Sequence, residues 1–195
     1  MKKIYYVLFL ILLSSCFSGR SQPSNFYVLR AIPEENITYN VKNSFIGIDV
    51  LYIASYLDRK EIITTVDGNN TEIQMSEFNR WAEPLSSAIQ RNIVLNMSTY
   101  MPNSLIRSIN AFNRNFDYIV LVYVNRFDGS FNDKVYLDAF YSIVDKKGKI
   151  VASDKVLLTN NLGNTYDDLA IQESDLISQL SQILAKKISQ IDSKW

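Results

Sequence analysis

The 195-residue chain contains no histidine and a single cysteine. The absence of histidine removes the usual general base near neutral pH, the Ser-His-Asp and Cys-His nucleophile systems, and histidine-ligated zinc. One thiol can form neither an internal disulfide nor a thiolate metal cluster. Only carboxylate, lysine, tyrosine or serine chemistry remains. We therefore expect a protein that is not an enzyme and that holds neither a metal nor a cofactor.

The chain also lacks an excess of either charge. It balances 20 Lys and Arg against 20 Asp and Glu, so no basic field is available to hold nucleic acid. Four carboxylates, Glu77, Glu83, Asp133 and Asp138, could in principle do acid–base work. The sequence shows no pairing and no perturbing neighbour for them, and we interpret them as solvated charges. A carboxylate-dependent hydrolase is therefore the least favoured function class.

The one cysteine directly follows a short apolar run at the N-terminus. Lys2 and Lys3 precede the apolar residues 4–13, a run well short of the ~20 residues that span a bilayer. Residues 13–16 read Leu-Ser-Ser-Cys, which matches the bacterial lipobox. The sequence therefore predicts a lipoprotein signal peptide over residues 1–15 and acylation of Cys16, which attaches the mature chain to a membrane.

The organisation behind this anchor is predicted to be simple. Residues 16–25 form the lipidated cysteine and a small, polar tether, and residues 26–195 form one domain of sufficient length for its own core. Phe17 follows the cysteine in place of the aspartate that marks inner-membrane retention in enteric bacteria. We therefore expect a lipid-anchored protein of the outer membrane that faces the periplasm.

Hydrophobic periodicity predicts an α+β fold. A long helix capped by Ser76 is expected to reach Tyr100, with Pro84 in its first turn or at a kink, and a second helix is expected over residues 166–191. Residues 67–70 predict a tight hairpin turn. The predicted strands cover residues 26–29, 45–53, 62–66, 71–75, 118–124, 134–144 and 149–158. Together they predict a mostly antiparallel sheet with the two long helices packed on it.

Several segments resemble one known family, the PqiC/YmbA-like auxiliary lipoproteins of ABC-type transport systems. Residues 56–63 are similar to the family's "YLDRPQIV" segment, although Lys60 replaces the usual proline. Residues 79–85 contain its distinctive "RWAEPL". Residues 116–129 resemble the family's central strand, which ends in "RF-x-G". Residues 137–141 are similar to the strand that follows it. The family's terminal helix is matched by Ala170, Ser174, Leu180 and Ala185.

The resemblance implies a non-enzymatic docking component of a lipid transport system. Members of this family are outer-membrane lipoproteins that face the periplasm, act as oligomers, and support envelope integrity. Their partners are MCE-domain proteins of the PqiB-like kind, with the associated membrane permease. The alternative that we keep open is a periplasmic carrier lipoprotein, which holds a lipid in its own apolar pocket between helix and sheet.

The first candidate for partner contact is a predicted loop. Tyr56, Leu57, Asp58 and Arg59 have no periodic role in a core, and loops carried on rigid elements often make contacts. The alternative interpretation is a structural one, in which hydrogen bonds between Asp58 and Arg59 tie the loop down.

The second candidate is the start of the predicted first helix. Trp81 could anchor an interface together with Arg80, or it could pack in the core. Arg80 and Glu83 lie three residues apart and could simply pair with each other. The twelve tyrosines and ten phenylalanines suit a sheet core as well as a surface that meets protein or lipid.

Overall fold

A computed structural model describes residues 22–66, 69–109 and 115–193. The predicted signal peptide and Cys16 lie outside the described residues. The secondary-structure elements are β1 (Asn25–Tyr27), β2 (Phe45–Ile53), β3 (Glu61–Val66), β4 (Asn69–Trp81), α2 (Leu85–Tyr100), β5 (Leu105–Ser108), β6 (Tyr118–Gly129), β7 (Lys134–Asp145), β8 (Ile150–Asn161) and α3 (Tyr166–Asp192).

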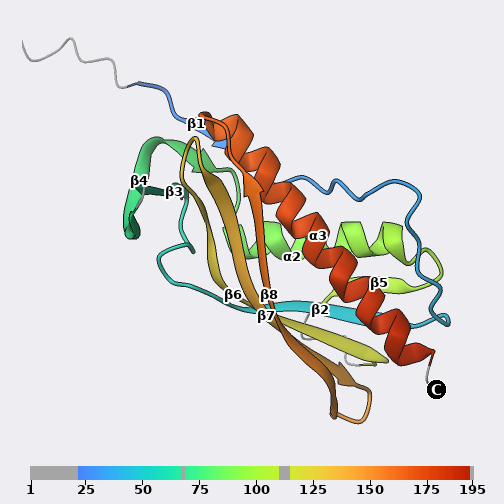
Figure 1. Ribbon diagram of the computed structural model, residues 1–195. Helices are drawn as coiled ribbons and strands as arrows, with labels where there is room; N and C mark the ends of the chain where they lie inside the picture. Colours follow the sequence, from blue (N-terminus) through green and yellow to red (C-terminus); the bar gives the residue numbers. More distant parts are fainter. Residues whose placement is uncertain (1–21, 67–68, 110–114, 194–195) are drawn as a thin grey trace, which may run out of the picture.

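The strands form one eight-stranded mixed sheet (Figure 1). The path runs β1-β4-β3-β6-β2-β5, and β7 and β8 follow on the other side of β6. The β6–β7, β7–β8 and β3–β4 pairs are antiparallel, as the predicted hairpin and meander require. The β1–β4, β2–β5, β2–β6 and β3–β6 pairs are parallel. The α+β class is confirmed, and "mostly antiparallel" holds only for the hairpin and the meander.

Both helices cover the same face of the sheet. Central strand β6 turns Val120, Val122 and Val124 toward them, each fully buried. The buried side chains of both helices and of the sheet form a single cluster. The apolar stripes predicted for the two helices therefore mark the true core faces, and the core lies between the sheet and the helix layer.

The predicted start of the first helix is wrong. Residues 76–81 belong to β4, where Arg80 pairs with Glu61 of β3, and α2 begins only at Leu85. Pro84 explains the difference, because its ring disfavours a helical conformation at the residue before it and so bars the helix from Glu83. Pro84 serves instead as the N-cap residue, and its carbonyl accepts the first helical hydrogen bond from the amide of Ala88 at 3.0 Å.

The second helix begins where the sequence predicts. Thr165 caps α3 by accepting a hydrogen bond from the amide of Asp168 at 3.0 Å, and acidic residues occupy the first turn, as suits the helix dipole. The start of α3 packs on the end of β6 at Gly129. A Cβ there would lie 2.7 Å from Cδ2 of Leu162 and 2.9 Å from Cδ1 of Leu169. The glycine of the family-like central strand is thus required by close packing.

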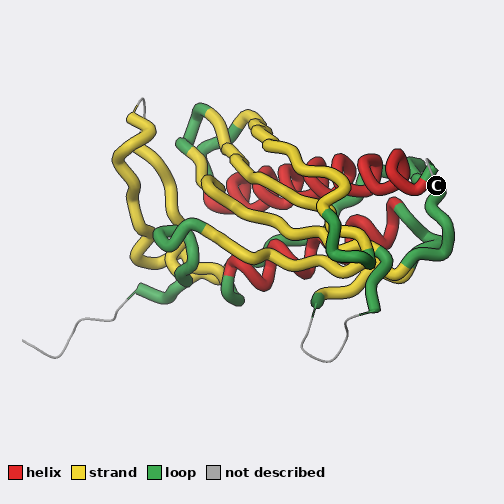
Figure 2. Tube along the Cα trace, turned by 90° about the horizontal axis from the view of Figure 1, so that it is seen from below, coloured by secondary structure: helices red, strands yellow, loops and turns green. Residues whose placement is uncertain are grey.

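The molecule is elongated and its two ends differ. The chain enters at β1, beside the start of α3 and the projecting β3–β4 hairpin (Figures 1 and 2). The C-terminus of α3 lies at the opposite end, on the side where the β7–β8 turn also lies. We call these the tether end and the C-terminal end. No helix within the described residues is long and apolar enough to cross a membrane.

Candidate functional site

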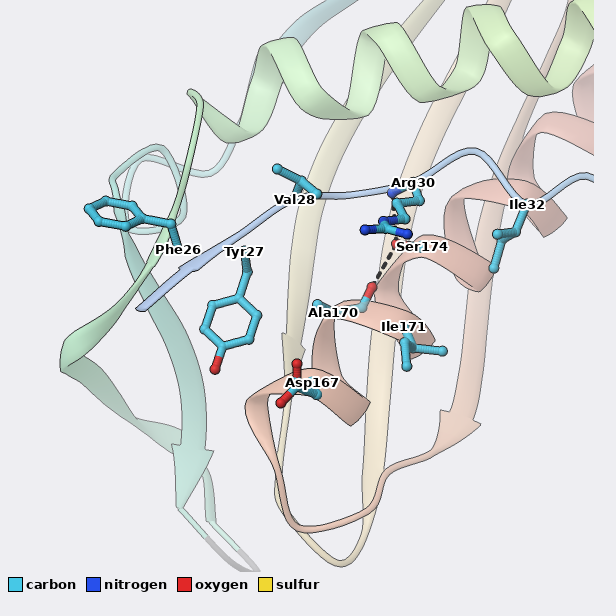
Figure 3. Close-up of a pocket in the computed structure, with 9 residues that line it drawn as sticks. All are labelled: Phe26, Tyr27, Val28, Arg30, Ile32, Asp167, Ala170, Ile171 and Ser174. Carbon is cyan, nitrogen blue, oxygen red and sulfur yellow. Dashed lines mark hydrogen bonds between the residues drawn. The ribbon is translucent and has the colours of Figure 1, made fainter. Parts of the chain in front are cut away.

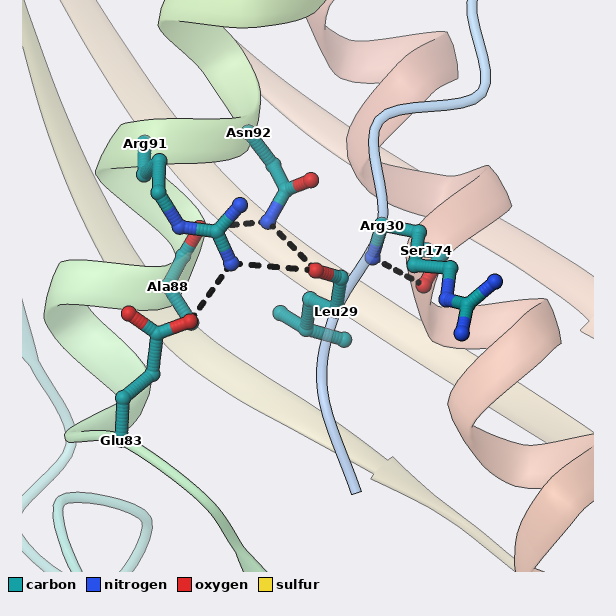
Figure 4. A network of polar contacts seen from close by, with 7 residues as sticks. All are labelled: Leu29, Arg30, Glu83, Ala88, Arg91, Asn92 and Ser174. Atoms are coloured by element: carbon teal, nitrogen blue, oxygen red, sulfur yellow. Dashed lines mark hydrogen bonds and ion pairs between the residues drawn. The ribbon is translucent and has the colours of Figure 1, made fainter.

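The chain behind the predicted anchor is held firmly between the two helices. After β1, residues 28–34 run along the gap between α2 and α3 on the outer side of the helix layer (Figure 4); we call this segment the strap. Leu29 points inward and is only 1% exposed, as part of the hydrophobic core. The strap is therefore an integral part of the domain.

Side chains of α2 hold the first carbonyl of the strap. Nδ2 of Asn92 and Nη2 of Arg91 each donate a hydrogen bond of 3.1 Å to the carbonyl oxygen of Leu29 (Figure 4). The same guanidinium forms an ion pair of 2.5 Å with Glu83. The sequence left open a pair of Glu83 with Arg80, and Glu83 pairs instead with Arg91, which also bonds to the strap.

Side chains of α3 and the end of α2 hold the next backbone groups. Oγ of Ser174 accepts from the amide of Arg30 at 3.1 Å, and Oγ of Ser178 donates to the carbonyl of Ile32 at 2.9 Å. The hydroxyl of Tyr100 accepts from the amide of Glu34 at 2.9 Å. The two helices thus bind an extended segment through alternating backbone groups, as a groove binds a peptide.

This recognition explains a polar seam in the helix interface. Asn92, Asn96, Ser174, Ser178 and Ser181 are all at most 3% exposed. Buried polar groups are normally hydrogen-bonded, and the strap satisfies several members of this seam. The sequence did contain a signal, because these residues recur at helical spacing. The strap partners of Asn92, Ser174 and Ser178 lie as far as 146 residues away along the chain, so the signal could not be interpreted from sequence. Ser181 donates instead to the carbonyl of Ile177 in its own helix, and the side chain of Asn96 has no hydrogen-bond partner among the described residues.

The tryptophan-containing segment pairs with β1, the strand that leads into the strap. Tyr27 of β1 pairs with Trp81 of β4, and the carbonyl of Tyr27 accepts from the amide of Ala82 at 2.8 Å. Trp81 is 4% exposed and packs in the core, as the structural interpretation expected. Arg80 is half-buried, opposite Phe26 and Glu61 on the two neighbouring strands.

The loop of Tyr56 to Arg59 is also tied to the domain. Leu57 is 1% exposed. Asp58 is exposed and 3.5 Å from Oγ of Ser86, while Nη1 of half-buried Arg59 lies 2.6 Å from Sδ of Met75. The loop is tied down through Leu57 and through these contacts with Ser86 and Met75, in place of the hydrogen bonds expected between Asp58 and Arg59. Asp58 remains exposed at the surface.

Tyr56 connects this loop to the end of β6. Its hydroxyl donates to Oδ2 of Asp128 at 3.2 Å, and Oδ1 of Asp128 accepts from Nε of Arg126 at 2.9 Å. Burial, followed by the charge and hydrogen bond of Asp128, raises the pKa of Tyr56 to about 12. The guanidinium of Arg126 lies 3.9 Å from the ring centre of Tyr136. Two segments of the family resemblance therefore meet in one network.

Glu173 of α3 is a buried carboxyl near this network. It is 1% exposed, and its Oε2 has no hydrogen-bond partner among the described residues. Burial raises its pKa well above the usual value, and the negative charge of Asp128 adds to the effect. Burial therefore disfavours the charged form of Glu173 in the folded protein.

A groove opens between the strap and α3 at the tether end (Figure 3). It has a volume of about 350 Å³. Four exposed apolar side chains line it: Phe26 (66% exposed), Val28 (41%), Ile32 (40%) and Ile171 (58%). Arg30 and Asp167 are its charged residues. The groove lies on the surface and does not enter the space between helices and sheet, where the carrier alternative expects a pocket.

The carboxylates considered for acid–base work are dispersed. Asp138 pairs with Lys155 at 2.9 Å on the sheet, Glu83 pairs with Arg91 at the start of α2, and Glu77 and Asp133 are exposed elsewhere. The described residues contain no group of three or more potential metal ligands. The most organised feature of this surface is therefore the strap with its groove.

Comparison with known proteins agrees with this fold. The chain is 17% identical to an uncharacterised protein of known crystal structure, with a TM-score of 0.72 over 86% of this chain and 99% of that one. It is also 17% identical to a DUF330 protein from Xanthomonas campestris, with a TM-score of 0.69 over 88% of this chain and 100% of that one. No curated protein matches.

The family assignment comes from a sequence match. The model of the family described as "ABC-type transport auxiliary lipoprotein component" matches residues 27–185. This range includes the whole strap, α2, most of α3 and every groove residue except Phe26. The chain therefore belongs to the family of ABC-type transport auxiliary lipoprotein components.

Proposed function

We propose that this protein is the outer-membrane lipoprotein of an MCE-type intermembrane lipid transport system. In this proposal Cys16 is acylated, the domain faces the periplasm, and copies of the chain assemble into a homo-oligomer. The domain acts without catalysis, as a docking piece for a PqiB-like MCE protein and its permease. The system moves lipid between the two membranes and so supports envelope integrity.

The observation that carries the proposal is the strap, together with the family match. A tether that ran into a loose loop would leave the domain free to turn beneath its anchor. Here the backbone of Leu29, Arg30 and Ile32 is hydrogen-bonded to two helices, so the anchor is connected to the rigid core about a dozen residues after Cys16. Such a connection favours a protein that must present a defined surface at a membrane.

The partner contact is proposed for the exposed members of the two candidate segments. Asp58 is exposed and Arg59 and Glu83 are half-buried at the surface, whereas Leu57 and Trp81 are buried. Tyr56, which bonds to Asp128, and Arg80, which lies opposite Glu61 in the sheet, hold their segments in place. An Asp58→Arg variant is expected to weaken capture of the MCE protein at least tenfold. Reversal of the charge removes any attraction between Asp58 and a basic group of the partner and replaces it with repulsion. The exposed Asp154 on β8 provides the matched control, Asp154→Arg.

The proposed anchor is tested by a Cys16→Ser variant. We expect it to fold like the parent, to leave the membrane fraction, and to fail to restore detergent resistance to a deletion strain. Circular dichroism, membrane fractionation and growth in detergent measure the three expectations. A soluble variant that restores resistance fully would contradict the docking role, and so would a wild-type chain that captures no MCE protein.

A further inference from the structure

The groove at the tether end carries an exposed apolar surface without a function in the fold. Phe26 and Val28 stand on alternate positions of the entering chain, and Ile171 lines the same groove from α3, nearer to Ile32 (Figure 3). Their exposed fractions, 66%, 41% and 58%, are high for large apolar side chains that stand together. Contiguous exposed apolar groups mark sites that meet protein or membrane.

The backbone beneath these side chains is fixed. Phe26 lies in β1 opposite Arg80, and the strap that follows is bonded to both helices through Leu29 and Arg30. Ile171 lies in the first turns of α3, whose start is capped by Thr165. The surface is therefore presented by ordered elements, and its exposure is a stable property of the domain.

The length of chain before the groove limits what can cover it. Cys16 and Asn25, the first residue of β1, are nine positions apart along the chain, and a fully extended chain of that length spans at most about 32 Å. An acylated Cys16 thus keeps the groove within about 32 Å of the bilayer in which its acyl chains lie. The membrane is the apolar phase that this surface is always near.

We propose that the groove residues dock on the lipid surface of the anchoring membrane. Phe26, Val28 and Ile171 enter the boundary between head groups and acyl chains, while Arg30 at the same groove remains in the head-group layer, where it meets lipid phosphates. An acyl anchor and a second apolar contact together hold a protein to a membrane more firmly than one signal alone. This inference rests on the acylation in the proposed function.

A label at Val28 tests the contact directly. Since Cys16 is the only cysteine and acylation consumes its thiol, a Val28→Cys substitution in the full lipoprotein introduces one reactive thiol. An environment-sensitive fluorophore there is compared with one on Lys147→Cys, an exposed position in the β7–β8 turn. In vesicles of phosphatidylethanolamine and phosphatidylglycerol with brominated acyl chains, we expect quenching at position 28 and none at position 147. Equal quenching at both positions, or none at either, would overturn the proposal.

A second measurement removes the acyl anchor. The Cys16→Ser chain is floated with the same vesicles, with and without a Phe26→Ser/Ile171→Ser pair, and we expect the pair to lower membrane partition about tenfold. The matched control is Ile150→Ser/Leu157→Ser, two side chains of β8 that are 60% and 64% exposed. If the two pairs of substitutions lower partition equally, the proposal is contradicted. It is also contradicted if the emission of the fluorophore at position 28 shifts to the blue only when the MCE protein is added.

The two proposals fail in different ways. A chain that is acylated and supports detergent resistance, yet shows no quenching at position 28, refutes lipid docking and leaves the proposed function standing. A chain that floats through its groove residues and carries no acyl group on Cys16 refutes the anchoring part of the proposed function.

Discussion

The tether end and the C-terminal end of this molecule are built from different chemistry. The groove at the tether end exposes Phe26 and Ile171, and the helix seam beneath it is polar and buried. A depression of about 380 Å³ at the C-terminal end has lysines and aspartates among its lining residues, including Lys42, Lys147 and Asp192. At the tether end, exposed apolar side chains lie above a layer of buried polar ones, while the depression at the other end is lined by charged side chains.

The two ends also differ in the side chains that bind backbone groups. Charged side chains at the C-terminal end satisfy nearby backbone groups, as Oδ2 of Asp192 does for the amide of Lys42 at 2.9 Å. At the tether end the same kind of bond is made by buried amides and hydroxyls, which lose more when a partner is removed. We therefore expect substitutions of these residues at the tether end to lower the free energy of unfolding more than matched substitutions at the C-terminal end.

The largest effect is expected from Leu29→Ala. The leucine is 1% exposed between the two helices, and truncation of a buried leucine costs about 2–5 kcal/mol. The neighbouring Val28→Ala is the control, because Val28 is 41% exposed and surface substitutions stay within about 0.5 kcal/mol. Denaturant unfolding gives both values. Equal losses for the two variants would show that the strap does not belong to the core.

A smaller effect is expected from Asn92→Ala. This change removes one of two side-chain donors to the carbonyl of Leu29 and should cost about 1–3 kcal/mol, because the bond is buried. Hydrogen exchange should rise in residues 28–34 before it rises elsewhere. The counterpart at the other end is Asp192→Ala, which removes the exposed acceptor of the Lys42 amide. If both variants lose the same stability, the proposed contrast between the ends is refuted.

The acids of the two ends should respond to pH in opposite directions. The pKa of Glu173 is raised by burial and then by Asp128, so the folded state binds its proton more tightly and stability falls as pH rises above the usual value of 4.5. The pKa of Asp145 is lowered, first by the hydrogen bond from the amide of Lys149. Its contribution is therefore present above the usual value of 3.8 and is lost as pH falls through the lowered pKa.

Two isosteric variants separate these effects. Glu173→Gln should flatten the fall in unfolding free energy above pH 4.5, and Asp145→Asn should flatten only the fall at acid pH. Unfolding curves collected across the pH range measure both slopes. A Glu173→Gln protein that keeps the parent's slope above pH 4.5 would mean that Glu173 ionises in the folded state without penalty.

The contrast also shows what sequence reasoning could reach. Patterns that depend on neighbours along the chain were interpreted correctly for the stripe of α3 from Tyr166 and for the β6–β8 meander. The strands of the predicted hairpin do pair as β3 and β4, but β4 begins at Asn69, inside the predicted turn, and extends to Trp81, and residues 67–68 of that turn lie outside the described residues. The start of α2 was missed because the helical spacing of Trp81 with Leu85 was weighed above the barrier that Pro84 presents. A stricter use of the proline would have ended the strand at residue 81 and begun the helix after residue 84.

The site itself was beyond local patterns. Residues 30–44 lie between two predicted strands, and nothing near them in sequence indicates that Ser178 binds the carbonyl of Ile32 across 146 residues. Parallel pairing of β1 with β4 likewise joins segments 54 residues apart. The ion partner of Glu83 is Arg91, which lies outside the pair with Arg80 that its spacing suggested. Contacts between distant segments decide this site, and one sequence does not reveal them.

The smallest effect is expected from Glu83→Gln, and it distinguishes stability from docking. The ion pair of Glu83 with Arg91 is 33% and 43% exposed, so solvent screens it and its removal should cost at most about 1 kcal/mol, less in high salt. Arg91 keeps its hydrogen bond to Leu29, and the strap should stay in place by hydrogen exchange. If capture of the MCE protein falls while stability and exchange do not change, Glu83 contacts the partner directly. If capture is unchanged, the carboxylate serves only the strap, because the variant leaves every other group of that surface where it was.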